Sequence, residues 1–536
     1  MEWWPTACTL TFNFSESHGV RCGSVYQGTS TIRYRKKTAV PPPTTKDGAA
    51  FFAIRKHVQS LGGLHCYGYT RVNASFAKKA KPLEILQYKV SRVGDAKGPL
   101  KLTSVKEVDT LDELLEGEKT ASKKESNSAA GKKAGRGKKT QQQDTTEEAC
   151  GDVIGSKIVL FQESDALPLD SQVELSMTFR GTVQDWDEGG IYCPNHTQNV
   201  ILTHFEVFLS RLAFPSPDHP RYRVRWQMKQ LQLPSSFSTV LHNCGETSSK
   251  VQGDSVQYSF PSFGPLPAYL VCFAAIAETL LVHHDTFTHQ EFPMSLSPPV
   301  EASLRVVALP GRGVEPQTLE RVAELVKKSV PLLESFFRCP FPSLLTDSFT
   351  VALLPTMPYI SGMEHHGCIF LNETIYSTHN KSPPSGAERD QLVIHEVTHH
   401  WAGNSLGLCF SVKEGICLLL EQVFESIIQG RPVKKVKSAH NTGATFDAVE
   451  SGKEFTGHTY QNALLALENV LNEIGYANFE ERIQKLFDAH LISWMQSVEA
   501  VGGLEVLQST GAGVDVDPTP FVESDTFMKY LTNADE

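Results

Sequence analysis

The first 300 residues alternate between apolar and polar positions in many short stretches. Val, Thr, Tyr and Trp recur at every second position, and Pro and Gly interrupt the runs. This period matches the pleat of a β-strand, in which successive side chains point to opposite faces. The clearest examples are residues 173–183, 222–233 and 303–309. The pattern therefore predicts an antiparallel β domain in this part of the chain.

The pattern changes after about residue 315, where apolar positions recur with the 3.6-residue period of a helix. Segments with this period are residues 318–337, 391–404, 413–430 and 460–475. Between them lie a strand candidate at 348–355 and a short hairpin that ends at 366–373. We therefore expect an α+β protein with two domains, a β domain over residues 1–305 and a small mixed sheet with helices over residues 306–536.

The β domain is interrupted by a hydrophilic segment at about residues 116–149. It contains no aromatic residue and no Val or Ile, so it cannot bury a core and is expected to be disordered. Its basic stretch, KKAGRGKK at 132–139, has the composition of a nuclear import signal or of an RNA-contacting patch. Such basic runs are more often solvated surface, so this stretch is a weak indication.

Composition and charge narrow the functions that remain. The 536 residues carry a net charge of −10, so no nucleic-acid binding is expected outside the basic stretch. Eleven cysteines without a CxxC pair are typical of reduced thiols. The N-terminus lacks a basic start followed by an apolar run, and the longest apolar stretch, residues 269–282, is too short to span a bilayer. We expect a cytoplasmic protein without membrane contact, with nuclear import if the basic stretch is a signal.

The densest cluster of chemically active side chains is VIHEVTHHWAGN at residues 393–404. Residues four apart on a helix share a face, so His395 and His399 can bind one cation, whereas His400 points elsewhere. Glu396 lies beside the pair and could take a proton from a metal-activated water. Two unrelated surface histidines would give the same letters, but the apolar flanks predict a buried helix, whose polar groups need partners. The motif therefore indicates a zinc site.

A catalytic zinc usually has a third protein ligand and one open position. The downstream candidates are Glu414, Glu421 and Glu425, whose spacings of seven and eleven residues place them near one helix face. Helical phase alone therefore leaves the third ligand open among these three.

Several motifs together resemble the gluzincin aminopeptidases, the family of the alanyl and puromycin-sensitive aminopeptidases and of leukotriene hydrolase. SGMEHHGCIF at 361–370 resembles the family's GxMEN loop, and KEGICLLLE at 413–421 is similar to its N-E-G motif with the following acid. Further blocks that resemble the family, in the same order, are 203–220, 266–274, 332–355 and 459–467. The resemblance implies a β domain followed by a thermolysin-like zincin catalytic domain, with one Zn²⁺ per chain.

The resemblance also favours one of the three candidate ligands. The family spacing of eighteen residues after the second histidine would reach Leu418, but only fourteen residues precede Glu414 here. Glu414 precedes Gly415 as in the family motif, and Glu421 stands at the family's later acidic position, so Glu414 is the expected ligand. Glu421 is then expected to accept a hydrogen bond from a ligand histidine. The alternatives are a helix-start acid for Glu414 and an unrelated acid for Glu421.

By the same resemblance, the expected activity is zinc-dependent removal of N-terminal residues from peptides with a free N-terminus. Glu364 and Glu206 match the positions that bind the substrate's amine, a role for which carboxylates are suited. Tyr460 matches the family's catalytic tyrosine, which stabilises the oxyanion. The residues expected to line the substrate's main chain are Gly362, Met363 and His365.

Departures from the family pattern leave a second function open. His365 stands where the loop motif has Asn, His366 replaces a Trp, and His219 replaces a structural acid. The sequence also ends soon after the catalytic motifs, so we expect the helical C-terminal domain that most relatives carry to be missing. The alternative to an aminopeptidase is therefore a catalytically inactive member that acts as a scaffold or binds peptides. Epoxide hydrolysis, as in the leukotriene branch, is a more remote alternative.

Overall fold

The computed structural model of the chain describes residues 2–14, 20–37, 63–67, 81, 83–93, 102–108, 150–151, 158–163, 171–194, 199–206, 209–245, 248–292, 294, 298–341, 348–432, 457–500, 521–522 and 524–532. The hydrophilic segment predicted at 116–149 and its basic stretch lie outside the described residues.

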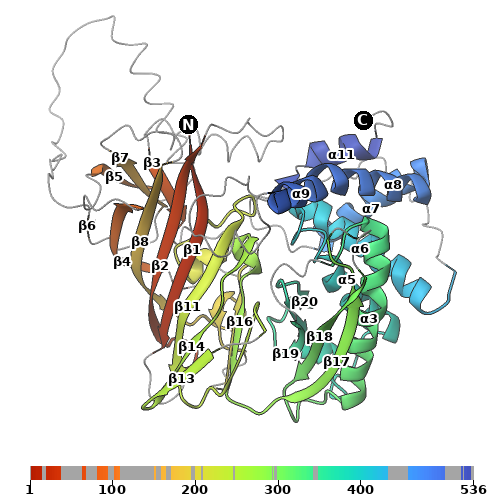
Figure 1. The fold of residues 1–536 in the computed structure, drawn as a ribbon. Helices are drawn as coiled ribbons and strands as arrows, with labels where there is room; N and C mark the ends of the chain where they lie inside the picture. The colour runs from red at the N-terminus through yellow and green to blue at the C-terminus, as the bar shows by residue number, and fades with distance from the viewer. Residues whose placement is uncertain are drawn as a thin grey trace, which may run out of the picture.

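Two packed sheets make up most of the β domain, on the left in Figure 1. The larger sheet contains, in spatial order, β13 (Ser248–Gln252), β14 (Ser255–Ser259), β11 (Val224–Pro234), β1 (Glu2–Phe14), β2 (Val25–Lys37), β8 (Gln172–Thr182), β4 (Glu84–Arg92) and β6 (Cys150–Gly151), with β15 (Phe263–Leu266) beside β11. The smaller sheet contains β12 (Thr239–His242), β16 (Phe273–Ile276), β10 (Val200–His204) and β9 (Gly190–Tyr192). A third sheet contains β3 (Gly63–Tyr67), β7 (Ile158–Glu163) and β5 (Leu102–Val108). The pairing is antiparallel, as predicted, except that β1 runs parallel to β11.

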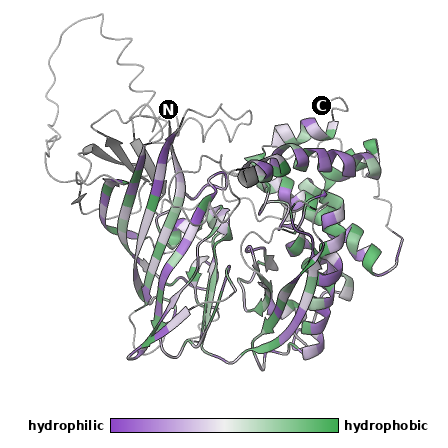
Figure 2. Cartoon of the chain, in the orientation of Figure 1, coloured by the Kyte–Doolittle hydropathy of each residue, from purple (hydrophilic) through white to green (hydrophobic). Residues whose placement is uncertain are grey.

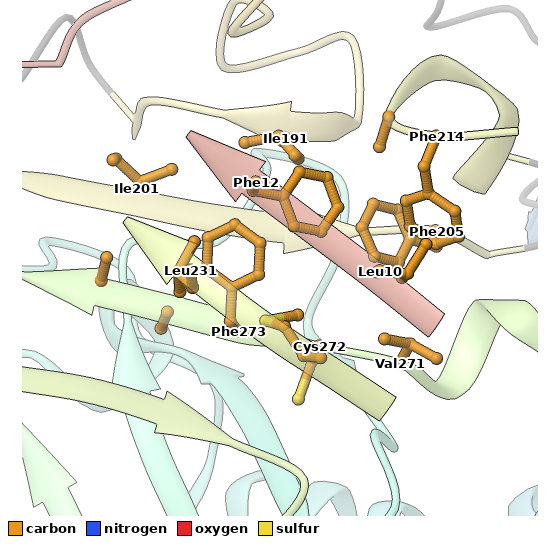
Figure 3. Close-up of a cluster of buried hydrophobic side chains, with 14 of the residues drawn as sticks. Leu10, Phe12, Ile191, Ile201, Phe205, Phe214, Leu231, Val271, Cys272 and Phe273 are labelled. Atoms are coloured by element: carbon orange, nitrogen blue, oxygen red, sulfur yellow. The ribbon is translucent and has the colours of Figure 1, made fainter. Parts of the chain in front are cut away.

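The core of the β domain lies between its two main sheets. In β8, buried and partly exposed positions alternate along most of the strand, so one face of the larger sheet is apolar. Figure 3 shows side chains of both sheets meeting there, among them Phe12 of β1 and Phe273 of β16. The centroids of these two rings are 6.0 Å apart. Full burial of each large apolar side chain contributes about 1.5–3 kcal/mol, which stabilises the scaffold beside the site.

A separate mixed sheet begins the second half of the molecule. Its strands, in spatial order, are β17 (Leu281–His289), β18 (Val300–Ala308), β19 (Ser348–Leu354), β21 (Cys368–Asn372) and β20 (Gly362–Met363). The expected domain limit at residue 305 falls within β18, which pairs in parallel with β19 from Ser303 to Ala308. The segment between Ile276 and Leu281 separates the mixed sheet from the last strand of the β domain. Alternation identifies a strand but not the sheet that it joins, which is why the sequence placed β18 in the first domain.

Helices cover the mixed sheet and build the wall of the second domain, on the right in Figure 1. They are α3 (Pro316–Phe337), α4 (Glu373–Tyr376), α5 (Gly386–Thr398), α6 (Phe410–Ile428), α7 (Gly457–Ile474), α8 (Tyr476–Phe487), α9 (Ser493–Ala500) and α11 (Ser524–Thr532). The four predicted helices are confirmed, each beginning slightly earlier than its apolar pattern, but α5 ends at Thr398 and not at residue 404. The long helix α3 shows a hydrophilic outer side and an apolar inner side in Figure 2.

Short elements complete the second domain. β22 (Gly407–Leu408) pairs in parallel with β23 (Phe521–Val522), which ties the end of the chain to the segment between α5 and α6. Residues Asp488–Ile492 form a π-helical turn between α8 and α9. None of the described helices combines the length and the apolar character that crossing a bilayer requires.

Candidate active site

Helix α5 places the two motif histidines on one face. Ser385 caps its start, and the side chains of Ser385 and Glu388 each bond to the other's backbone N–H, which fixes the first turn. The helix ends at Thr398, but His399 keeps helical dihedral angles and its N–H donates to the carbonyl of His395. The Nε2 atoms of His395 and His399 are 3.1 Å apart. Both side chains are buried, so the pair lies inside the protein rather than on a solvated face.

Glu414 joins this pair from the first turns of α6. Its Oε2 atom lies 3.3 Å from His395 Nε2 and 3.6 Å from His399 Nε2. A tetrahedral zinc with ligands at about 2.0–2.1 Å places any two donor atoms about 3.3 Å apart. The three donor atoms therefore already have the spacing that a zinc ion requires. Leu418, which the family spacing would have selected, lines the cavity one turn further along α6.

The connection from α5 to α6 is short but firmly held, which explains how four fewer residues still deliver Glu414. Arg223 of the β domain reaches across and donates to the carbonyls of Gly403, Asn404 and Ser405. The indole N–H of Trp401 donates to the carbonyl of Cys339. Because α6 begins at Phe410, directly after β22, the carboxylate of Glu414 faces the histidines from its first turns.

The outer ring nitrogens of both histidines have acceptors. His395 Nδ1 lies 2.7 Å from Glu421 Oε2, and His399 Nδ1 lies 3.2 Å from the carbonyl of Ala402. When the ring proton is on Nδ1 and donates to these acceptors, Nε2 is unprotonated and its lone pair faces Glu414. This is the tautomer in which Nε2 can bind a metal. Cys417 Sγ also lies 3.2 Å from His399 Nδ1. Glu421 thus stands where the sequence expected an orienting acid.

Glu396 points into a cavity of about 510 Å³. The residues that line this cavity are Glu206, Tyr359, Ile360, Ser361, Gly362, Glu364, Ile375, Pro384, Glu388, Gln391, Leu392, His395, Glu396, His399, Glu414, Leu418, Glu421 and Tyr460. Glu396 Oε2 is buried and finds no hydrogen-bond partner within the described part of the chain. Burial raises the pKa of Glu396 well above its usual value; the charge of His395 opposes this shift, and the neighbouring carboxylates add to it. An acid with an unpartnered oxygen in a cavity is placed to exchange a proton with a bound molecule.

Tyr460, near the start of α7, also lines the cavity. Its ring packs edge-to-face against Phe410, with 5.7 Å between the centroids. Burial, together with the nearby carboxylates of Glu414 and Glu206, raises the pKa of the Tyr460 phenol well above its usual value. The phenol therefore keeps its proton and can donate a hydrogen bond into the cavity.

The predicted amine-binding acids come together, but they are not alone. Glu206 follows β10 of the β domain and Glu364 follows β20, and both are buried at the cavity wall. The ammonium of Lys413 donates to both carboxylates and lies 3.1 Å from Glu414 Oε1. Burial alone would lower the pKa of Lys413, but Glu206 and Glu364 more than offset it and hold the pKa well above its usual range.

The carboxyl groups of Glu206 and Glu364 respond differently to this arrangement. Burial raises the pKa of Glu206 to about 8, and the charge of Glu364 adds to the shift. Burial would also raise the pKa of Glu364, but Lys413 and His399 hold it at about 2. Sequence reasoning gave Lys413 no role. The available signal was a lysine in place of the Asn of the family's N-E-G motif.

The three loop residues expected along the substrate occupy different environments. Gly362 lines the cavity, and a Cβ there would lie 2.2 Å from Glu396 Oε1, so only glycine allows this contact. The side chains of Met363 and His365 are buried and do not reach the cavity wall. The His365 ring packs edge-on against Phe370. The structure therefore does not bring His365 to a substrate, because the loop turns it toward the core behind β21.

His400, excluded from the metal by helical phase, has other contacts. Its Nδ1 lies 3.2 Å from the carbonyl of Glu396, and its Nε2 accepts from the N–H of Gly367. The ring stacks on Phe341. His400 thus fastens the loop before β21 to the end of α5 and points away from the other two histidines, as the helical phase predicted.

Comparison with known families finds matches in both halves of the chain. The Peptidase M1 N-terminal domain matches residues 117–270, and the Peptidase family M1 domain matches residues 321–510. The chain belongs to the peptidase M1 family. This membership confirms the resemblance to the gluzincin aminopeptidases and the β domain followed by a catalytic domain.

Individual M1 relatives are similar at low identity. The chain is 24% identical to aminopeptidase M1-D of Oryza sativa subsp. japonica over 257 residues, which are 46% of this chain and 26% of that protein. It is 24% identical to glutamyl aminopeptidase of Rattus norvegicus over 259 residues, 46% of this chain and 25% of that one. Protein TMA108 of Saccharomyces cerevisiae is 23% identical over 278 residues, 47% and 26% of the two chains. The matched part thus spans about a quarter of each of these relatives.

Proposed function

We propose that this M1 family member is a zinc-dependent aminopeptidase that acts on peptides with a free N-terminus. The observation that carries the proposal is the spacing of the His395, His399 and Glu414 donor atoms, which suits tetrahedral zinc. Glu396 and a cavity of about 510 Å³ lie directly beside these donors. When bound, zinc would polarise the peptide carbonyl and lower the pKa of a water molecule toward neutrality.

The side chains of this chain divide the remaining work. Glu396 accepts a proton from the attacking water and returns it to the departing amine, a task that its unpartnered Oε2 atom allows. The phenol of Tyr460 donates a hydrogen bond to the oxygen of the attacked carbonyl group, on which negative charge develops. β20 is the edge strand of its sheet, so the backbone at Gly362 is placed to run beside an extended substrate. Glu364 and Glu206 would face the substrate's amine.

Release of a fluorophore from unblocked aminoacyl amides tests this proposal. The zinc-loaded protein should turn over at least one such amide, a chelator should stop turnover, and added zinc should restore it. Glu396→Gln should lower kcat by about 10²–10⁴-fold with unchanged zinc content, since it removes the proton acceptor and no ligand. Glu320→Gln, the same exchange at an exposed position of α3, is the matched control and should leave turnover unchanged.

The opposite result would support the second interpretation. A protein that holds one zinc per chain and yet cleaves no amide across a panel of first residues would be an inactive member that binds peptides. Equal turnover by the Glu396→Gln variant and the unmodified chain would also reject the assignment of Glu396, because the reaction would then not depend on its carboxylate.

A further inference from the structure

Lys413 presents an ammonium group in the recess that is expected to receive the substrate's ammonium group. Its Nζ donates to Glu206 and Glu364, the two acids at the amine end of the cavity. It also lies 3.1 Å from the Oε1 atom of Glu414, whose other oxygen faces the histidines. The side chain itself is only 3% exposed. An internal cation thus occupies the hydrogen-bonding capacity that a peptide's α-amine would use.

The lysine is held in this position from several sides. Nζ lies 5.0 Å from the ring centroid of Tyr269 and 5.3 Å from that of Phe410, both within the range of cation–π attraction. A Cβ on Gly403 would lie 3.1 Å from Lys413 Cδ, so the connection between α5 and α6 packs against the aliphatic stem. These contacts hold the ammonium beside the acids that line the cavity, although Lys413 is not itself one of the lining residues.

The charge of the recess follows from these contacts. Carboxylate oxygens of Glu206, Glu364 and Glu414 lie within 4.8 Å of one another, a density of negative charge that attracts a cation strongly. Lys413 neutralises part of this charge from within the chain. A second ammonium, brought by a peptide, would meet carboxylates that are already paired and a like charge beside them, which disfavours its binding.

We propose that Lys413 sets the N-terminal specificity of this site, so that peptides with an uncharged, acylated N-terminal nitrogen bind about as well as those with a free amine. The inference rests on the proposed function, because it concerns the same cavity. It adds a substrate class, N-acylated peptides, that a site with two unpaired acids would reject. Lys413 also joins the β domain to α6 through Glu206, but a purely structural link predicts equal losses for both kinds of peptide when it is removed.

The test compares a short peptide amide with its N-acetylated twin, using zinc-loaded protein that carries Glu396→Gln so that nothing is consumed. With Lys413 present, calorimetric Kd values for the two peptides should differ by less than about tenfold. Lys413→Asn, which restores the residue of the family motif, should shift the ratio toward the free amine by about 100-fold, since charged hydrogen bonds become available. Lys327→Asn, on the exposed side of α3, is the matched control and should shift nothing.

The outcomes separate cleanly. A preference for the free amine above about 100-fold with Lys413 in place would overturn the inference without any change at that position. An unchanged ratio in folded Lys413→Asn would also overturn it, and parallel losses for both peptides would assign Lys413 a structural role only. Turnover measured with Glu396 restored tests the proposed function separately. A shifted binding ratio without hydrolysis would reject the peptidase, and hydrolysis with an unshifted ratio would reject the role of Lys413.

Discussion

The two ends of the cavity are built in different ways. At the metal end, His395, His399 and Glu414 come from α5 and α6, two helices that follow each other along the chain. At the amine end, Lys413 meets Glu364, 49 residues away in the chain, and Glu206, 207 residues away. Helical spacing places the two histidines of the first cluster, whereas the second cluster includes Glu206 only because the β domain packs against the catalytic domain.

This difference matters for how each end can change. The metal end needs three donors at a fixed spacing, so a shorter connection is tolerated only if the carboxylate returns to the same place. The amine end is a balance of charges, and one residue can alter it without moving the backbone. Lys413 is adjacent in the chain to Glu414, the proposed zinc ligand, yet its ammonium contacts the distant acids Glu206 and Glu364 of the other end. The two ends should therefore respond separately to substitution.

The largest effect is expected from Glu414→Gln. The amide keeps the size of the side chain but removes the anionic oxygen that faces both histidines, so zinc affinity should fall by more than about 1,000-fold, and activity with it. Metal analysis after dialysis against a weak chelator measures the loss. Retention of one zinc per chain by this variant would reject Glu414 as a ligand.

Glu421→Gln is the natural control for that experiment. It removes the acceptor of the His395 Nδ1 hydrogen bond but no ligand, so zinc affinity should fall by only about 10–100-fold. Equal losses in both variants would mean that Glu421 and Glu414 cannot be told apart as ligand and orienting acid.

Tyr460→Phe should come next in size. The ring and its packing on Phe410 remain, but the donor to the oxyanion is lost, so kcat should fall by about 10²–10³-fold while zinc content and KM stay the same. Steady-state kinetics on one aminoacyl amide give both constants. An unchanged kcat would assign Tyr460 to packing alone.

Gly362→Ala tests the close contact between the backbone of β20 and the side chain of Glu396. The added methyl would lie 2.2 Å from Glu396 Oε1 and must displace that side chain, so activity should fall by about 100-fold although no functional group is removed. Gly386→Ala, where nothing lies within 4 Å of an added Cβ, is the control. Full activity in Gly362→Ala would show that the Glu396 side chain can act from another position and does not depend on its contact with Gly362 of β20.

Glu364→Gln should have the smallest effect and confine it to the amine end. One of the two acids beside Lys413 becomes neutral, so the KM of a free-amine amide should rise about tenfold while zinc content is unchanged. A parallel loss of zinc would show that the two ends are coupled through Lys413 and Glu414 and do not respond separately to substitution.

Much of the fold was predictable because it depends on local periods. The helices around 318–337 and 413–430 carry an apolar stripe that fixes both their type and their buried face. The strand limits were harder: β18 alternates like the strands before it, yet it pairs with β19 of the following sheet. Pairing partners depend on contacts between segments far apart in the chain, and alternation carries no information about them.

The sequence by itself determined the metal end. The four-residue interval between His395 and His399 sets their common face on any helix, and the resemblance to the M1 motif singled out Glu414 before any distance was known. Only the tertiary structure decided the amine end. It buried His365 away from the cavity and brought the ammonium of Lys413 between Glu206 and Glu364. A helix repeats every 3.6 residues whatever surrounds it, whereas the balance of charges in a recess depends on every segment that packs there.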